Sequence, residues 1–489
     1  MAAFLYDREV SDDEFRQRVR RHRPSSLIPV LAKIASRHWE PQSWLARDHM
    51  KFTPWALAEV ARTSLVFGNE HRPPATERDV LECCAAHSAL RDPQLQRGDA
   101  ASFFLRLGTE QMSYQQPAFS ELARTVALLD LTPPSVRGLS TIRGDWQTRL
   151  LGTTLMQWLT AGHLLLAGAL AHDGQIPQGW QKDPSLLDFA ETVDLDNLPD
   201  IVTSQFATDR AGFMERQPSL GTIRPLFARR LAFNPLLARP AIKGLTDDTL
   251  IVPSPGALIR KLSPLGLYHL GLREWGNAFS EDLGLVFEAY VGNQLRLMPE
   301  VTVEPSIKYG TAESIDWFVI ADDAVLFVEV KSTRPDESVR LGSEDARGYI
   351  SKRLGRAVEQ LNKTVRLVRD GRPEFNHIPT DRPLLGLVVT MEPFHTLNAG
   401  LYKGWLPPCD IPFRVCGIDE IEGMVSQRET ERTMGLVHAL MTDPDREGWH
   451  LQSAFADQPR RRNDLLDQAW NRLPWTSPVT SLSAGTTEL

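Results

Sequence analysis

Two short apolar runs separated by a pair of aspartates constrain the fold of this 489-residue chain more than any other feature. The runs at 314–320 and 324–330 are rich in β-branched and aromatic residues and predict two strands. Asp322 and Asp323 between them predict a two-residue hairpin turn. Burying a charge is costly unless it is paired or binds a metal, so the few charges within these strands need an explanation.

The turn determines which residues stand opposite each other. Counting outward from a two-residue loop pairs Phe318 with Phe327, and a four-residue loop gives the same register. Two residues further out, Asp316 meets Glu329. Opposed side chains share one face of a sheet about 5 Å apart. Lys331 lies two residues beyond Glu329 and shares that face, so the sequence predicts two carboxylates and one ammonium group in a single patch.

Two opposed carboxylates repel each other, and something must offset their charge. Lys331 alone could do so, in a buried ion triad that only stabilises the hairpin. A divalent cation is the other solution, because Mg²⁺ takes one or two carboxylates together with waters and phosphate oxygens. The residues by themselves leave both solutions open.

The chain falls into three parts. Residues 1–275 predict mostly helices of unknown role, separated by Pro-rich turns. Residues 276–430 predict strands alternating with helices, and hence a mixed sheet flanked by helices. Residues 431–489 predict a helical extension and a Ser/Thr-rich, disordered tail from about 474. The predicted fold class is therefore mixed, α+β or α/β.

Periodicity predicts the individual elements. In the first part these are helices at 53–68, 77–90, 118–131, 145–171 and 254–272, with a strand at 249–254. In the second part they are a helix at 280–297, strands at 301–309, 314–320 and 324–330, a helix at 347–370, a strand at 383–390, and a strand, turn and helix at 411–425.

This order of elements, with Asp316 before the hairpin and the segment EVK at its end, resembles the PD-(D/E)XK nuclease superfamily. That family has the restriction-endonuclease-like fold. The resemblance covers about residues 280–425, less than a third of the chain. Ile315 stands where the name of the motif has proline, a position that varies widely in the family.

The resemblance implies metal-dependent hydrolysis of phosphodiester bonds. It implies the catalytic residues Glu288, Asp316, Glu329, Lys331 and Gln360. It implies that Mg²⁺ or Mn²⁺ is held by Asp316, Glu329, the Val330 carbonyl and Glu288. Lys331 would orient a water or stabilise the developing charge, Glu288 would hold a second metal or a metal-bound water, and Gln360 would position the lysine or the substrate.

The helix expected at 347–370 carries a second clue. Its apolar residues form one stripe, and basic residues lie off that stripe. The candidates for nucleic-acid binding are Lys352, Arg353, Arg356 and Lys363. A solvated helix face would have the same pattern, so contact with phosphates is one of two interpretations.

Composition excludes several classes. A net charge of −8 excludes a protein that is basic all over, but not a local basic groove. No GxSxG, Walker-type or GxGxxG motif is present, which argues against ATP-driven action within this chain. The four cysteines have no zinc-type spacing and predict free thiols in a reducing cytosol. The apolar window 155–174 predicts a buried core helix and not a membrane span.

These observations predict a cytoplasmic, Mg²⁺-dependent endonuclease that acts on DNA. A role in genome maintenance or in antiviral defence against foreign DNA follows from what such nucleases usually do. Two alternatives stay open: a catalytically inactive nuclease fold used for nucleic-acid binding or assembly, and an RNA-directed nuclease. A homo-oligomer or a protein partner bound through residues 1–275 is also left open.

Overall fold

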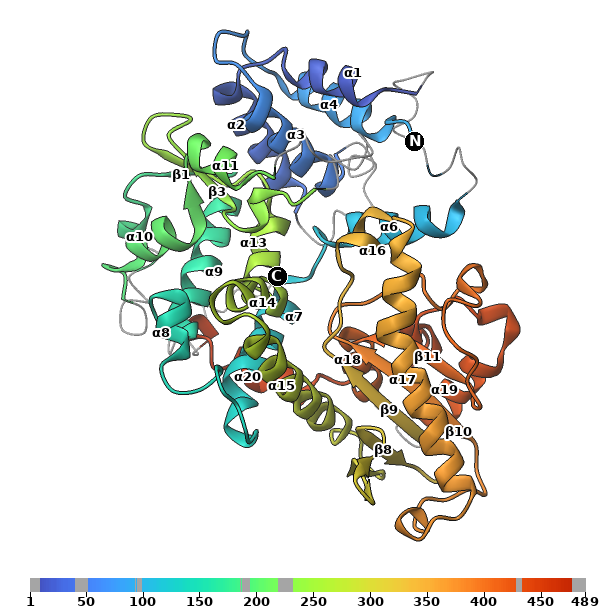
Figure 1. Ribbon diagram of the computed structural model, residues 1–489. Coiled ribbons are helices and arrows are strands. Elements are labelled where there is room, and N and C mark those ends of the chain that lie inside the picture. Colours follow the sequence, from blue (N-terminus) through green and yellow to red (C-terminus); the bar gives the residue numbers. More distant parts are fainter. Residues whose placement is uncertain are drawn as a thin grey trace, which may run out of the picture.

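The structure is a computed structural model that describes residues 9–39, 52–92, 94, 99–184, 186, 194–218, 232–427 and 433–476. The described residues form a mixed α+β fold. Figure 1 shows the helices of the N-terminal region on one side and a sheet covered by a long helix on the other. The tail expected to be disordered lies mostly outside the described residues.

The larger sheet has five strands in the order β11-β10-β9-β8-β5. Their bounds are Thr302–Pro305 for β5, Trp317–Ile320 for β8, Val325–Lys331 for β9, Leu384–Thr390 for β10 and Phe413–Gly417 for β11. β9, β10 and β11 run parallel to one another, whereas β8 is antiparallel to both β5 and β9. The sheet is therefore mixed, as the sequence predicts.

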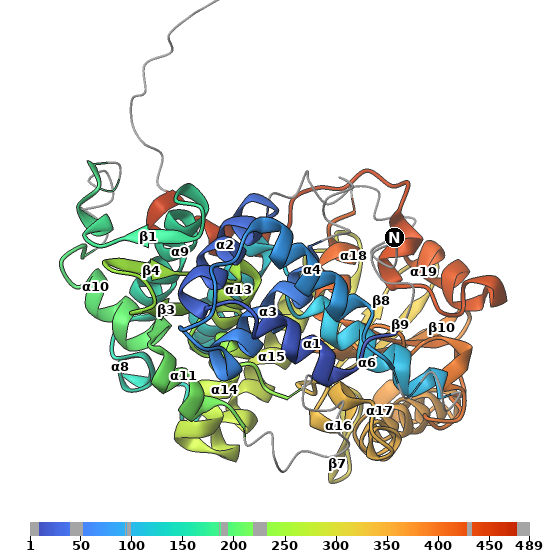
Figure 2. The ribbon, with the colours of Figure 1, turned by 90° about the horizontal axis from the view of Figure 1, so that it is seen from above.

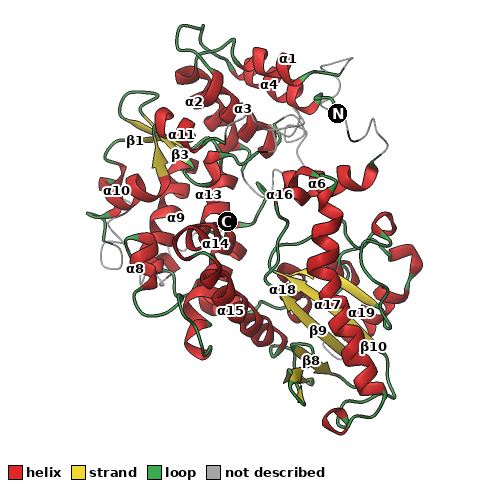
Figure 3. Ribbon diagram, in the orientation of Figure 1, coloured by secondary structure: helices red, strands yellow, loops and turns green. Residues whose placement is uncertain are grey.

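Helices cover both faces of this sheet. α15 (Asn277–Leu295) and α18 (Ile418–Val425) pack with Val319, Leu326 and Val328. α17 (Asp345–Arg369) packs against the opposite face, over Phe318 and Phe327, and crosses the sheet in Figure 3. The predicted apolar stripe of α17 is confirmed, since all its members are buried: Ile350, Leu354, Val358, Leu361, Val365 and Val368. Alternation along the strands thus supplies two separate layers of core.

The N-terminal region contains mostly helices and a small sheet. Its helices are α1 (Asp12–Val19), α2 (Pro24–Arg37), α3 (Pro54–Phe67), α4 (Glu77–Ser88), α6 (Ala100–Met112), α7 (Ala118–Val126), α8 (Trp146–Leu151), α9 (Leu155–Ala171), α10 (Leu198–Ile201), α11 (Arg210–Arg216), α13 (Pro255–Leu262) and α14 (Pro264–Trp275). Its sheet has the order β1-β4-β3-β2, formed by Gln175–Pro177, Thr249–Ile251, Ala241–Lys243 and Ala207–Thr208. Of these strands the sequence predicts only β4.

Short elements complete the chain. They are β6 (Lys308–Tyr309), β7 (Ala312–Glu313), α16 (Glu337–Leu341), α19 (Thr433–Thr442) and α20 (Asp464–Trp470). The strand expected at 301–309 is therefore wrong as one unit, because β5 pairs with β8 whereas β6 pairs with β7.

Several expected helices differ at their ends or in the middle. The helix expected at 254–272 is two helices, because Ser263 ends α13 and caps α14, which begins at Pro264. The helix expected at 145–171 is two helices, because Gly152 adopts a left-handed conformation (φ 72°) that ends α8. The helix expected at 118–131 finishes in a π-helical turn at Ala127–Leu131. The helix expected to begin at 280 begins at Asn277.

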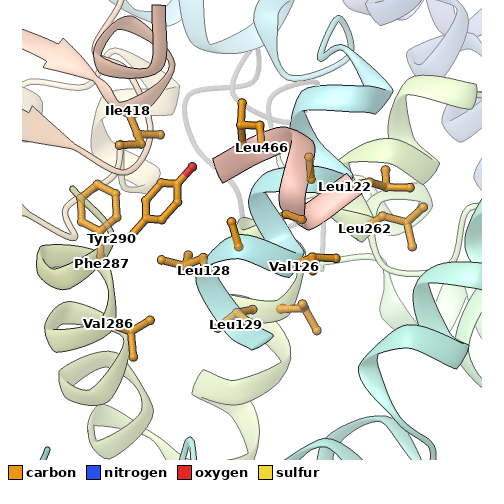
Figure 4. Packing of buried hydrophobic residues seen from close by; sticks show 14 of the residues in the cluster. Leu122, Val126, Leu128, Leu129, Leu262, Val286, Phe287, Tyr290, Ile418 and Leu466 are labelled. Carbon is orange, nitrogen blue, oxygen red and sulfur yellow. The ribbon is translucent and has the colours of Figure 1, made fainter. Parts of the chain in front are cut away.

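One hydrophobic core joins the parts on either side of residue 275. Figure 4 shows Leu122, Val126 and Leu262 of the N-terminal region beside Tyr290 of α15 and Leu466 of α20. These residues belong to one cluster that also reaches β8 and β9. The sequence therefore changes texture near 275 without beginning a separate core.

A buried polar network reinforces that junction. Arg124 of α7 donates two hydrogen bonds of 2.7 Å to the two carboxylate oxygens of Glu422 on α18. The Tyr290 hydroxyl donates to the same carboxylate at 2.8 Å. Buried charges are stable in such a geometry because every oxygen has a donor.

The apolar segment Trp146–Ala171 is long and apolar enough, by length and composition alone, to cross a membrane. In this fold α9 is an internal helix, and Trp158, Leu159 and Leu165 have no exposed surface. The prediction of a buried core helix is confirmed. The four cysteines are free thiols, of which Cys409 alone is partly exposed.

Candidate active site

The hairpin that carries the predicted site has the predicted register. The Ala321 amide donates a hydrogen bond of 3.0 Å to the Ala324 carbonyl and closes the turn. Phe318 lies opposite Phe327, and the two rings pack edge to face with centroids 5.3 Å apart. The same register, continued by one residue before β8, sets Asp316 opposite Glu329.

Asp316 reaches across the hairpin to the backbone of β9. Its Oδ2 accepts a hydrogen bond of 2.6 Å from the Val330 amide. Burial raises the pKa of Asp316 above its usual value, although this hydrogen bond acts in the opposite direction. The carboxylate is therefore held directly against the segment that contains Glu329 and Lys331.

Glu329 is the most buried acid of the site, with 4% of its surface exposed. Lys331 donates from Nζ to Glu329 Oε1, while Oε2 is buried without a hydrogen-bond partner among the described residues. Burial, and after it the charge of Asp316, raise the pKa of Glu329 to about 7. A buried oxygen without a donor is costly, and an added cation would remove that cost.

Glu288 approaches the same carboxylates from α15. It is half-buried, and burial followed by the charge of Asp316 raises its pKa to about 7. The helix is fixed here by the Trp317 indole, which donates to the Glu288 carbonyl at 3.1 Å. A Cβ atom on Gly292 would come within 2.2 Å of the Trp317 ring, so this close approach requires glycine.

Gln360 is bonded to the backbone that precedes Asp316. Its amide nitrogen donates to the carbonyl oxygens of Glu313 (2.9 Å) and Ser314 (3.0 Å), and its two hydrogens are thereby used. Among the described residues Gln360 makes no recorded hydrogen bond to Lys331, and the expectation that it positions Lys331 or the substrate stays a prediction. Gln360 fixes the segment that leads into Asp316.

Thr364 assists Gln360, and sequence reasoning did not single it out. Its hydroxyl, one helical turn further along α17, accepts a hydrogen bond of 3.2 Å from the Ile315 amide. The sequence signal was a buried polar residue on the edge of an apolar stripe, which identifies a partner only once the position of the helix is known.

The basic residues of α17 lie where the sequence places them. Lys352, Arg353, Arg356 and Lys363 are exposed. In the part of the chain that the structure describes, no carboxylate forms an ion pair with any of them, whereas Arg366 binds Asp410 at 2.9 Å. Lys363 lies 5.3 Å from the centroid of the Tyr309 ring. This face is available to an external anion.

A second charged group lies just beyond the ends of β9 and β10, and the sequence did not indicate it. Glu392, two residues after β10, binds Arg260 of α13 and, at 3.3 Å, Arg340 of α16. Arg334, three residues beyond Lys331, lies 3.3 Å from the centroid of the Tyr268 ring of α14. The partners come from distant segments, so no local pattern could have revealed them.

The donor set fits a hard divalent cation. Across the described ranges, no three or more His, Cys, Asp or Glu side chains are grouped so that they could hold a metal ion by themselves. Mg²⁺ does not require such a group, because it keeps several waters and takes one or two carboxylates. Asp316 and Glu329 both have raised pKa values, and one Glu329 oxygen is buried without a hydrogen-bond partner, so the pair meets that requirement.

Comparison with models of known protein families and with curated protein sequences finds no match for this chain. Its function must therefore be argued from the hairpin and its surroundings.

Proposed function

We propose that this chain is a divalent-metal-dependent nuclease that hydrolyses phosphodiester bonds in DNA. The observation that carries the proposal is the opposed pair Asp316 and Glu329, with one buried Glu329 oxygen left without a donor and Lys331 beside it. Buried oxygens are mostly paired where a group of charges serves stability alone, so a free oxygen at this position needs another account. A group built for a cation would leave it free.

The arrangement of elements supports the same proposal. A helix (α15), an antiparallel hairpin (β8–β9), a helix on the other face (α17) and two further parallel strands (β10 and β11) occur in the order expected of the restriction-endonuclease-like fold. The acids lie at the end of the hairpin, which is where that family has its metal site.

Mg²⁺ or Mn²⁺ would be held by Asp316, Glu329 and the Val330 carbonyl, with Glu288 as a further acid beside them. When bound, the cation would supply Lewis-acid polarisation of the scissile phosphate. Asp316 is already fixed for this role by its hydrogen bond to the Val330 amide. Gln360 and Thr364 hold the segment that precedes it.

Lys331 and Glu288 would act on the reacting groups. The Lys331 side chain is 32% exposed, so its ammonium group can reach both Glu329 and a substrate at the surface. There it would orient the attacking water or stabilise the charge that develops on the phosphate. Glu288, with a pKa of about 7, can exchange a proton at neutral pH as the water forms its bond to phosphorus and the leaving oxygen departs.

One observation favours a second candidate, a nuclease fold without catalysis. Lys331 already pairs with Glu329, and Asp316 is already bonded to the Val330 amide, so the hairpin closes without a metal. In that case the charges would hold the hairpin in a protein that only binds nucleic acid.

Incubation of the full chain with plasmid DNA tests the two candidates. Mg²⁺ or Mn²⁺ should support cleavage, and Ca²⁺ should support binding without efficient cutting. RNA of matched length in parallel tests the choice of DNA. Robust cleavage in excess EDTA would contradict the metal site, and no cleavage of either nucleic acid in any of these metals would favour the non-catalytic candidate.

A further inference from the structure

One face of α14, the helix that precedes α15, is exposed. His269 and Arg273 are both exposed. They are four residues apart on a helix, so they lie on the same side, about 6 Å apart. Among the described residues Arg273 forms no hydrogen bond or ion pair with another side chain.

The end of this α14 face at His269 adjoins the candidate active site. Tyr268 of α14 is covered by the Arg334 guanidinium, 3.3 Å from the ring centroid. Arg334 follows Lys331 by three residues. Burial and then the charges of Arg340, Arg334 and Arg260 lower the pKa of His269 to about 4, so its ring is a neutral hydrogen-bonding group beside these cations. Glu392 offsets only part of their charge. Positive charge therefore continues from the end of β9 onto α14.

The other end adjoins a second group of cations in the N-terminal region. This group consists of Arg273, Arg216, Arg239 and Lys261. Arg239 donates to the Ser204 carbonyl and Arg216 to the Gly212 carbonyl, so both are fixed by neutral partners. In the part of the chain that the structure describes, no carboxylate forms an ion pair with any of the four.

Burial and, after it, mutual repulsion lower the pKa values of two members of this second group. Burial, followed by the charges of Arg216 and Arg273, lowers the pKa of Arg239 to about 10. Burial, followed by the charge of Arg239, lowers the pKa of Lys261 to about 7. Lys261 is 3% exposed and lies between the Trp158 and Phe206 rings. An anion outside the protein would relieve this repulsion.

The two groups and the basic face of α17 belong to one side of the molecule. Figure 2 shows α11, α14 and α17 along the same edge of the view, with α4 away from that edge, nearer the middle. A linear polyanion lying on that side would meet α17, the end of β9, α14 and α11 in turn. Phosphates spaced along a nucleic acid have this form.

We propose that Arg334, His269, Arg273, Arg239 and Arg216 form a band that holds the phosphate backbone of the DNA whose scissile bond lies at Lys331. The inference rests on the proposed function and extends it. It gives the N-terminal helical region a role, because α11 and α14 then form part of the substrate-binding surface. Contacts of this kind set affinity and register and carry no base specificity.

Salt-dependent binding of a fluorescent duplex to the full chain, in Ca²⁺, tests the band. The test variant is the double charge reversal Arg216→Glu with Arg273→Glu. The matched control is Arg72→Glu with Arg78→Glu, which reverses two exposed arginines, one in the turn before α4 and one on α4, and makes the same change in net charge. Each phosphate contact contributes about 0.9 to the slope of log affinity against log salt concentration, so the test variant should lose about 2 and the control nothing.

A second double variant and a shorter duplex test whether the loss of slope comes from lost phosphate contacts. Arg216→Gln with Arg273→Gln removes charge without reversing it and should lose about the same slope, which guards against misfolding of the first variant. Shortening the duplex until it spans only the hairpin should remove the difference between wild type and variant. Cleavage of the long duplex in Mg²⁺ is measured on the same preparations.

The results separate this inference from the proposed function. If wild type binds and cuts DNA but both double variants keep the wild-type slope, the band is overturned and the nuclease stands. If wild type neither binds nor cuts nucleic acid, the proposed function and the band are both contradicted. If polyglutamate displaces the duplex from wild type as well as unlabelled DNA does, the band is a site for an acidic protein segment and the inference is overturned.

Discussion

Two buried glutamates at the same edge of the sheet have opposite environments. Glu392, just after β10, is 8% exposed and binds two arginines, and despite its burial Arg260 and then Arg340 lower its pKa to about 2. Glu329, near the end of β9, is 4% exposed, faces the acids Asp316 and Glu288, has one lysine, and has a pKa of about 7.

The difference separates a carboxylate that is paired within the fold from one that the proposed function assigns to a ligand. Glu392 is fully compensated, as is Glu422 with Arg124 and the Tyr290 hydroxyl. Around Glu329, only Lys331 offsets the negative charge of Glu329 and of the neighbouring acids Asp316 and Glu288. Strongly perturbed acids in a group are a feature of functional sites, whereas compensated pairs are structural. Substitutions of the two glutamates and of Lys331 test whether the two sites differ in this way.

The largest expected effect is on cleavage. Lys331→Ala keeps both carboxylates and removes the group that assists the water, so the rate should fall by about 10²–10⁴. In Mg²⁺ the melting temperature should change little, because the cation still neutralises the acids. Plasmid cleavage and thermal melts measure the two effects, with Lys308→Ala as the control, since Lys308 lies on β6 and is 80% exposed.

The opposite result would identify a structural ion triad. A severe loss of stability in Lys331→Ala that Mg²⁺ does not restore, together with no cleavage by wild type, would show that Lys331 holds the hairpin and takes no part in a reaction.

The next largest effect is on stability. Glu392→Gln leaves Arg260, whose side chain is 9% exposed, without its charge partner. Breaking a buried ion pair in this way costs about 3–5 kcal/mol. The matched substitution Glu329→Gln leaves only Lys331, which can turn to solvent, and should cost much less. Urea unfolding of both variants measures the free energies, and equal losses would remove the distinction between the two glutamates.

A smaller effect is expected on binding by the basic face of α17. Arg356→Glu with Lys363→Glu removes two exposed cations without disturbing the buried stripe. The slope of log affinity for duplex DNA against log salt concentration should decrease by about 2, independently of sequence. Fluorescence anisotropy over a salt series measures it, and an unchanged slope would show that this face is only solvated.

The hairpin was predictable because its constraints are local. The length of the turn and the two-residue period of a strand together determine that Asp316 meets Glu329. The apolar stripe of α17 was predictable for the same reason, since a helix repeats within a few residues. These two elements gave both the site and the helix that covers Phe318 and Phe327.

What could not be predicted depends on packing between distant segments. The true partners of Gln360, the Glu313 and Ser314 carbonyls, depend on where α17 lies relative to the strand before Asp316. The pairing of Glu392 with Arg260 joins positions far apart in the chain. The strands of the small N-terminal sheet are only two or three residues long, too short for any periodicity to show.

The smallest expected effect is a dependence on pH that distinguishes the two glutamates directly. Glu329 has a folded-state pKa of about 7, above the usual value of 4.5. Without metal, its contribution to stability is therefore complete below about pH 4.5 and is lost as the pH rises through about 7. In EDTA the melting temperature of Glu329→Gln should approach or exceed that of wild type at about pH 8, and should not do so at about pH 5.

Mn²⁺ should reverse the order at the higher pH. A cation binds the charged carboxylate and releases its proton, so wild type should gain stability in Mn²⁺ at about pH 8 and gain little at about pH 5. Glu329→Gln should gain little at either pH. Glu392 has its pKa lowered to about 2, so Glu392→Gln should be destabilised throughout this range, with or without metal. If Mn²⁺ stabilised Glu329→Gln as much as wild type, the cation would bind elsewhere, and the unpaired oxygen of Glu329 would need another explanation.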